Sequence, residues 1–138
     1  MLDRILADYR GRVRLAFKDF PLPGHALARP AHEAARCAGA FNKYWKYHDR
    51  LFQAQPEFSR PHLLRYATDL GIPADSFTRC LDSGQFRNLV EADVEQGQQM
   101  GISGTPTFFI NGERLIGAAP YEAFKEIIDE ALREAGKR

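Results

Sequence analysis

The residues best suited to chemistry lie in one block near the end of the chain, Gly-Ile-Ser-Gly-Thr-Pro-Thr-Phe-Phe-Ile-Asn-Gly from Gly101 to Gly112. The glycines at its start end the helix that is predicted before it. Pro106 then begins an apolar run, and because proline has no N–H for a sheet ladder, it suits the first residue of a strand. The Thr105-Pro106 bond is a candidate cis peptide, and Asn111-Gly112 is a strong hairpin signal. The block therefore predicts a strand entered through proline and left through a tight turn.

The histidines are the other candidates, as metal ligands. They are His25, His32, His48 and His62, and Cys37 could join them. No pair among them has the His-x-x-x-His or Cys-x-x-Cys spacing of a zinc site. His48 lies on the aromatic face of its predicted helix, which favours a packed or hydrogen-bonded side chain. We therefore predict no metal site and no cofactor.

Aromatic residues at helical spacing, Phe41, Tyr44 and Trp45, could line a groove for a peptide. The same spacing is typical of a helix face that is turned to the core, and we favour that interpretation. Two charged pairs at helical spacing are predicted to be solvated surface pairs: Glu33 with Arg36, and Asp129 with Arg133.

Composition narrows the class of protein. The chain has 138 residues, which is the size of one domain with a real core. Its 44% hydrophobic and 27% charged residues are typical of a soluble globular protein. A net charge of +1 gives no basic surface for nucleic acid. No apolar run approaches the roughly 20 residues of a membrane helix, and the first residues read as an amphipathic helix rather than a signal peptide. We expect neither a nucleic-acid nor a membrane partner.

The periodicity of apolar residues and the positions of glycine and proline predict the elements that must position the Thr-Pro block. The predicted order is a helix, a strand covered on both faces, four or five helices, a hairpin and a last helix. The residue ranges are helix 2–9, strand 13–20, helices 30–39, 41–52, 59–71, 73–84 and 86–100, strands 107–110 and 114–116, and helix 120–132.

The chain resembles the DsbA-type thioredoxin-like family in several segments that fall in the right order. The resemblance implies an α/β fold, namely an incomplete thioredoxin-like fold with a helical insertion in a small mixed sheet. Residues 1–24 and 100–138 would form the thioredoxin-like part and residues 25–99 the helical insertion, within one domain of residues 1–138. The matching segments are Phe17–Pro23, Glu33–Ala38, Trp45 with His48-Asp49 and Leu51-Phe52, Cys80–Ser83, and Gly101–Gly112.

One departure from the family is large. The family begins with a strand that runs into a Cys-x-x-Cys pair at the start of the first helix, and the first cysteine is a nucleophile whose pKa is lowered by the helix end. This sequence has no Cys-x-x-Cys and begins at what resembles the back half of that helix. We therefore predict no catalytic residue in this chain. A truncated chain or a misplaced start is the favoured explanation, with a fragment and a true pseudo-enzyme left open.

The resemblance assigns substrate binding to Thr105 and Pro106. In the family this loop lies beside the active cysteines, and its backbone can pair with an extended peptide. Thr105 would present the backbone groups that face the substrate. Pro106 would offer no N–H, and its ring would limit the approach of competing groups such as metals. The implied partner is a polypeptide substrate or a redox partner protein.

Cys37 and Cys80, the only cysteines, lie on different predicted helices and form no redox motif. Three interpretations stay open: a structural disulfide that pins two helices of the insertion, a reactive dithiol, or two buried free thiols. We favour the structural disulfide, because the count is even and the family resemblance implies a periplasmic or other extracytoplasmic location.

Three functions are carried forward. The favoured one is the C-terminal portion of a DsbA-like thiol:disulfide oxidoreductase, catalytically incomplete as given. The alternatives are a non-catalytic peptide-binding or chaperone-like module, and a relative of the glutathione-dependent isomerases and kappa-type glutathione transferases, which use serine in place of the first cysteine. The strand that the family places between 13–20 and 107–110 is missing here. Unpaired sheet edges invite pairing with another chain, so we expect a homodimer or a swapped assembly.

Overall fold

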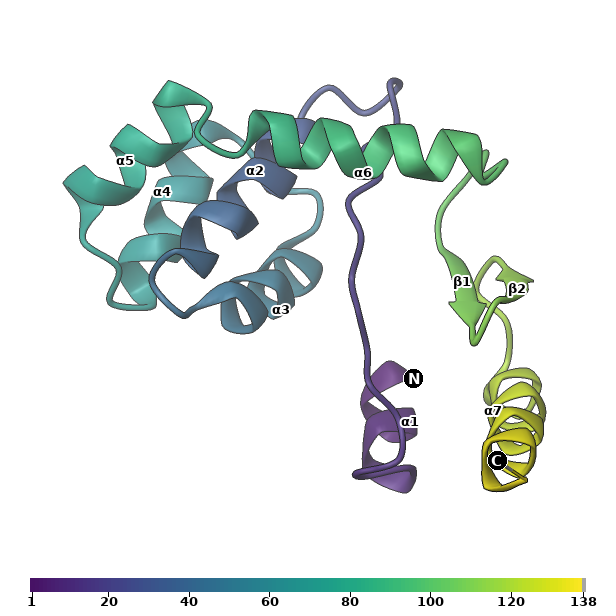
Figure 1. Ribbon diagram of the computed structural model, residues 1–138. Helices are drawn as coiled ribbons and strands as arrows, with labels where there is room; N and C mark the ends of the chain where they lie inside the picture. The colour runs from purple at the N-terminus through teal and green to yellow at the C-terminus, as the bar shows by residue number, and fades with distance from the viewer. Residues whose placement is uncertain (138) are drawn as a thin grey trace. The chain divides into compact units, whose positions relative to one another are not determined.

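The computed structural model describes residues 1–137 and divides into two compact units (Figure 1). The helical unit is Asp19–Met100. The terminal unit combines Met1–Lys18 with the chain from Gly101 onward. The predicted insertion, residues 25–99, falls inside the helical unit, and its status as an insertion into a thioredoxin domain stays a prediction.

The helical unit is built from five helices among its described residues, each close to a predicted one. Glycine and proline set most of their ends. Pro61 lies in the first turn of its helix, after Ser59 at the N-cap. Gly84 ends another helix with φ 65°, a left-handed conformation that glycine adopts without strain. The helices are α2 (Ala28–Gly39), α3 (Tyr44–Ala54), α4 (Arg60–Asp69), α5 (Ala74–Ser83) and α6 (Arg87–Gln99).

The core of the helical unit forms around α2, whose inward face is made of small residues. Ala34 and Ala38 of α2 are fully buried, and such short side chains let neighbouring helices approach closely. Tyr47 and Phe77 fill the centre with their ring centroids 5.7 Å apart. The Tyr47 hydroxyl donates a hydrogen bond of 2.8 Å to the Leu63 carbonyl, so the one polar atom of this buried ring is satisfied.

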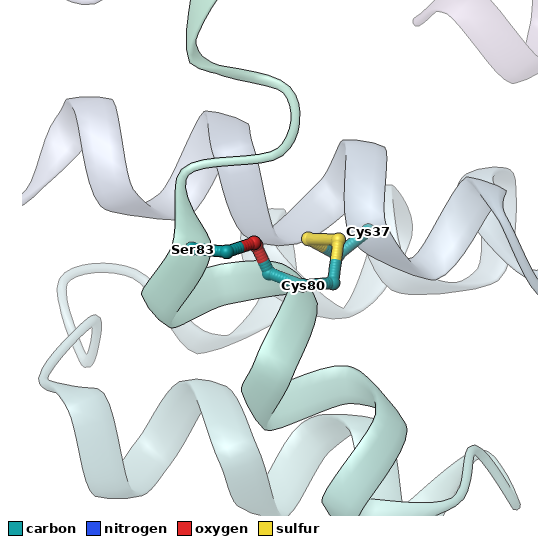
Figure 2. Close-up of a disulfide and its surroundings, with 3 residues drawn as sticks. All are labelled: Cys37, Cys80 and Ser83. Carbon is teal, nitrogen blue, oxygen red and sulfur yellow. A yellow bond between two sulfur atoms is a disulfide. The ribbon is translucent and has the colours of Figure 1, made fainter.

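A disulfide joins Cys37 of α2 to Cys80 of α5, with a Cα–Cα distance of 5.9 Å (Figure 2). The sequence left open a structural disulfide, a reactive dithiol and two buried free thiols. The structure shows the two cysteines joined by a disulfide. Both half-cystines are buried in the helical core. The bond closes a loop of 43 positions, which restricts the unfolded chain somewhat more than a short loop would, since the effect grows with the logarithm of loop length.

The terminal unit contains α1 (Leu2–Asp8), the strands β1 (Thr107–Ile110) and β2 (Glu113–Ile116), and α7 (Tyr121–Gly136). The strands pair in antiparallel fashion, with Thr107 opposite Ile116 and Ile110 opposite Glu113. Both turn residues have positive φ, 48° at Asn111 and 89° at Gly112, as a two-residue hairpin turn of this type requires. The predicted hairpin is confirmed. A small core beneath it contains Ile5, Tyr9, Phe124 and Ile128.

The predicted strand at residues 13–20 is wrong as a strand. This segment is extended but forms no ladder with another described segment, and the only sheet in residues 1–137 is β1–β2. Its burial alternates from Val13 to Lys18, with every second side chain exposed, so it is covered on one face rather than two. The alternation gave the correct backbone shape, but a strand also needs a neighbour that takes up its N–H and C=O groups.

The fold class is confirmed as α/β and rich in helix. The predicted mixed sheet is wrong in one respect: within residues 1–137 the sheet has only two strands, and a tight turn makes them antiparallel. Most helix ends differ from the prediction by one or two residues, and α7 continues to Gly136, four residues beyond its predicted end. The helix expected from Phe41 begins at Tyr44, because residues 40–43 form a turn in which Asn42 has a φ of 60°. The helix expected from Pro30 begins earlier, at Ala28, so the proline lies in its first turn.

The cross-link predicts a measurable share of the stability. Reduction of the Cys37–Cys80 bond should lower the free energy of unfolding by roughly 4 kcal/mol, because the loop closed in the unfolded chain is long. Urea unfolding followed by circular dichroism, with and without a phosphine reductant, measures this difference. The matched control is the Cys37→Ala/Cys80→Ala double variant, whose unfolding midpoint should not respond to the reductant. Equal midpoints for the oxidised and reduced wild type would contradict the prediction.

Candidate substrate-binding loop and the Asp19 network

The candidate loop connects α6 to β1 and carries Thr105 and Pro106, both of which are exposed. The peptide bond between them is cis. Hydrogen bonds hold the chain on each side. The Thr107 hydroxyl donates to the Gly104 carbonyl at 2.7 Å, and the Gly117 N–H donates to the Pro106 carbonyl at 2.8 Å. The loop is therefore tied both to itself and to the segment that follows β2.

Thr105 lies between the two bonded carbonyls of Gly104 and Pro106, and its own backbone is left open. Within residues 1–137, neither its N–H nor its C=O takes part in a backbone hydrogen bond. Unpaired backbone groups of this kind must be satisfied by water or by a ligand. An extended peptide offers a matching donor and acceptor, which is the basis of recognition by strand addition.

The open backbone of Thr105 continues into an open sheet edge. In the described part of the chain β1 pairs only with β2, so one edge of Thr107–Ile110 has no protein partner. The side chains of β1 are half-buried, and Phe108 packs edge-on against Phe124 of α7 at 4.8 Å between ring centroids. The strand is thus fixed from its α7 side while its hydrogen-bonding edge stays available.

A second cluster of polar side chains lies in the helical unit, around the buried carboxylate of Asp19. Nδ1 of His32 lies 2.8 Å from one carboxylate oxygen, and Nε of Arg36 donates to the other at 2.7 Å. Arg36 also donates to Asp93 of α6 at 2.7 Å, and the Asp19 N–H donates to Asp93 at 2.9 Å. Because a carboxylate only accepts, Nδ1 of His32 carries the proton.

The electrostatics of this cluster follow from its burial and its hydrogen bonds. Burial by itself raises the pKa of Asp19, but the hydrogen bonds and charges of His32 and Arg36 outweigh it and leave the pKa below its ordinary value. Burial, followed by the charge of Asp19, raises the pKa of Tyr44 well above its ordinary value. The network therefore keeps Asp19 ionised and Tyr44 neutral across the physiological range.

The sequence did not predict this cluster, and the predicted partner of Arg36 is wrong. Arg36 was predicted to form a solvated pair with Glu33, but it pairs with Asp19 and Asp93, and Glu33 is buried. A usable signal existed, because His32 and Arg36 are four apart and share one face of α2.

The pair predicted between Asp129 and Arg133 is also replaced by other partners. Asp129 accepts hydrogen bonds from Lys125 and from the buried Tyr9 hydroxyl, both at 2.6 Å, and Arg133 pairs with Glu130. Helical spacing alone did not distinguish between neighbouring charged residues on α7, since several lie three or four positions apart.

The aromatic residues of α3 and of the turn before it do not all face the core, so that prediction is wrong in part. Phe41 and Tyr44 pack against the helical core, but Trp45 is 46% exposed and Phe52 is 56% exposed. His48 lies between these two rings, 5.2 Å from Trp45 and 4.7 Å from Phe52 between ring centroids. Helical spacing identified a shared face but did not show what covers it.

Neither a metal site nor a membrane span emerges from the described residues. No cluster of three or more His, Cys, Asp or Glu side chains among residues 1–137 is arranged to hold a metal ion. Within the same residues, no helix combines the length and apolar character that crossing a bilayer requires.

Comparison with known proteins now identifies the family. The family model described as thioredoxin matches residues 1–130. The chain belongs to the thioredoxin family. Two solved structures have the same fold, which confirms the predicted DsbA-type likeness. One is oxidised BdbD from Bacillus subtilis, with a TM-score of 0.87 and 26% identity; the match covers 96% of this chain and 77% of BdbD. The other is the thiol-disulfide exchange protein alpha-DsbA2 from Wolbachia pipientis, with a TM-score of 0.83 and 21% identity; the match covers 94% of this chain and 70% of alpha-DsbA2.

Two sequence relatives of this thioredoxin-family chain differ in kind. Disulfide bond formation protein D of Bacillus subtilis is 31% identical over 67% of this chain and 44% of its own length. The Na(+)/H(+) antiporter NhaA 3 of Salinispora tropica is 35% identical over 97% of this chain and 21% of its own length. The chain thus spans about a fifth of the antiporter relative.

The Asp19 cluster predicts a large loss of stability when its carboxylate is removed. Asp19→Ala should lower the free energy of unfolding by about 3–5 kcal/mol at pH 7, because it leaves the Arg36 charge and His32 without their shared acceptor. Urea titrations measure the difference. Asp69→Ala is the matched control, since its pair with Arg50 is exposed and should contribute less than about 1 kcal/mol.

The same cluster predicts an acid-sensitive component. Because the pKa of Asp19 is lower in the folded chain than in the unfolded one, its stabilisation is fully present above the unfolded pKa. It is lost as the pH falls through the folded value. An Asp19→Asn variant, which cannot ionise, should lack this component. Parallel acid-unfolding curves for the wild type and Asp19→Asn would contradict the assignment.

Proposed function

We propose that this chain is the substrate-binding portion of a DsbA-like thiol:disulfide oxidoreductase, catalytically incomplete in the 138 residues given. The observation that carries the proposal is the exposed Thr105 backbone, open on a loop that is tied down on both sides. The fold shared with BdbD and the 31% identity to disulfide bond formation protein D support the same reaction class.

In this proposal, the loop and β1 bind the substrate, and a separate Cys-x-x-Cys pair carries out the attack. An extended substrate would lie along Thr105 and the open edge of β1, with its backbone paired by strand addition. Pro106 offers no N–H that could compete for the substrate. A thiolate would then attack the substrate disulfide, form a mixed disulfide and release one substrate thiol. That thiolate would come from a Cys-x-x-Cys pair, which these 138 residues do not contain.

Two other functions differ in the nucleophile they require. A non-catalytic peptide-binding or chaperone-like module would need none. A relative of the glutathione-dependent isomerases or kappa-type transferases would need a serine. Sequencing the gene upstream of the codon for residue 1 distinguishes them: Cys-x-x-Cys in frame supports the oxidoreductase, serine at the first of those positions supports the transferase-like function, and neither supports the binding module.

The partner and location follow from the same proposal. The partner is a polypeptide substrate or a redox partner protein. The Cys37–Cys80 disulfide favours an extracytoplasmic location, because such bonds persist in oxidising compartments. The antiporter relative favours a second setting, in which a domain of this kind is joined to a membrane transporter, and an in-frame membrane segment in the same gene would support it.

Peptide binding at Thr105 can be tested by a backbone substitution. An extended hexapeptide with an S-methylated cysteine, titrated into isotope-labelled protein, should shift the amide NMR signals of Ser103–Thr107 and of β1. Thr105→Pro removes the N–H that would pair with the peptide and should weaken binding about tenfold or more, since one hydrogen bond is lost and the peptide's carbonyl acceptor is left unpaired. Thr105→Val is the matched control, because it keeps the N–H and the side-chain shape. Equal binding by both variants, or shifts far from the loop, would contradict the proposal.

We also propose that the chain forms a homodimer or a swapped assembly. The edge of β1 that faces away from β2 and the extended residues 13–16 offer backbone groups to another strand. Ile116 at the end of β2 is 71% exposed. Sedimentation velocity from one to one hundred micromolar should show a species of twice the monomer mass, and Phe109→Pro, which removes an N–H from β1, should reduce it. A single monomeric species over the whole range would contradict self-association.

A further inference from the structure

A shallow, open depression of about 670 Å³ lies on the surface of the helical unit, and Cys80 is one of the residues that line it. Ser76, Arg79, Ser83 and Gln85, all from α5 or the turn after it, contribute polar groups. Figure 2 shows Ser83 and Cys37 on opposite sides of Cys80, and the Ser83 hydroxyl donates to the Cys80 carbonyl at 3.1 Å. One half of the disulfide, Cys80, thus borders a polar surface.

The two half-cystines are not equivalent. Cys37 is 1% exposed and lies among the buried alanines of α2, and it does not line the depression. Cys80 is 6% exposed and does. Of the two half-cystines, Cys80 is therefore the one that borders solvent, and attack at Cys80 would leave Cys37 as the leaving group.

The charge of the depression favours binding of an anionic small molecule. Asp82, which also lines it, is paired with Arg60 of α4 at 2.6 Å. Arg79 is exposed and has no acidic partner within residues 1–137. The depression beside Cys80 therefore contains one guanidinium without an acidic partner, together with hydroxyl and amide side chains. Such a group attracts carboxylates and stabilises a thiolate.

We propose that the Cys37–Cys80 bond is a site of thiol–disulfide exchange for low-molecular-weight thiols that carry carboxylates, with attack at Cys80. The incoming thiolate forms a bond to the Cys80 sulfur, the Cys37–Cys80 bond breaks, and its electron pair leaves on Cys37 as a thiolate, which takes a proton from water. The product is a mixed disulfide on Cys80, and the Cys37 thiol can reverse the step by expelling the small thiol. This inference does not depend on the proposed function.

Single-cysteine variants test which sulfur is accessible. Cys37→Ala leaves the Cys80 thiol and Cys80→Ala leaves the Cys37 thiol. In native buffer with glutathione disulfide, intact mass spectrometry should show the adduct forming at Cys80 at least about tenfold faster than at Cys37, because accessibility controls the exchange. Equal rates, or faster reaction at Cys37, would overturn the proposal.

The wild-type protein provides an independent test that needs no cysteine substitution. Opening of the disulfide by glutathione, trapped with iodoacetamide, should be first order in thiol. Arg79→Gln should slow it about threefold at low ionic strength, as expected for loss of one attractive charge, while the rate with uncharged 2-mercaptoethanol stays the same. Arg79→Lys should keep the wild-type rate, and Arg65→Gln, an exposed arginine on α4, is the matched control. A rate independent of thiol concentration, or no selective effect of Arg79→Gln, would overturn the proposal.

Discussion

The buried carboxylate of Asp19 holds together the parts of the helical unit that are furthest apart in sequence. Asp19 is the first residue of that unit, yet its side chain and N–H reach His32 and Arg36 of α2 and Asp93 of α6. Only 2% of Asp19 is exposed, and an uncompensated charge at such a depth would cost several kcal/mol. The chain can bury this residue only when α2 and α6 are both in place, so the network couples the start of the unit to its last helix.

The disulfide and the Asp19 network stabilise α2 by different physical means. The Cys37–Cys80 bond ties α2 to α5 and acts mainly on the unfolded chain, because it limits the conformations open to the loop between them. The network acts on the folded chain through geometry and charge, so it responds to pH. Since α2 also supplies the small buried residues of the core, both constraints converge on the helix around which the others pack.

The sequence predicted local structure well where local chemistry decides it. Asn111-Gly112 and Gly84 ended elements where the structure has them, since their positive φ values are properties of those residues. Contacts between residues far apart in the chain could not be predicted in the same way. The segment that begins at Val13 alternates like a strand, but pairing depends on a neighbour elsewhere in the chain. Trp45 lies on the aromatic face of its helix, but whether another element covers that face depends on tertiary packing. The Asp19 cluster joins residues up to 74 positions apart, which no periodicity could reveal.

Thr105 combines two properties that a peptide-binding loop needs and that usually oppose each other. Free backbone groups tend to belong to mobile loops, and ordering a mobile loop costs free energy on binding. Here the neighbouring groups are already bonded, Thr107 to Gly104 and Pro106 to Gly117, so little freedom remains to be lost. The sequence pointed to Thr105 and Pro106 only through a family resemblance. The structure adds a geometric argument for that proposal: the carbonyls of Gly104 and Pro106 are bonded, and Thr105 between them makes no backbone hydrogen bond.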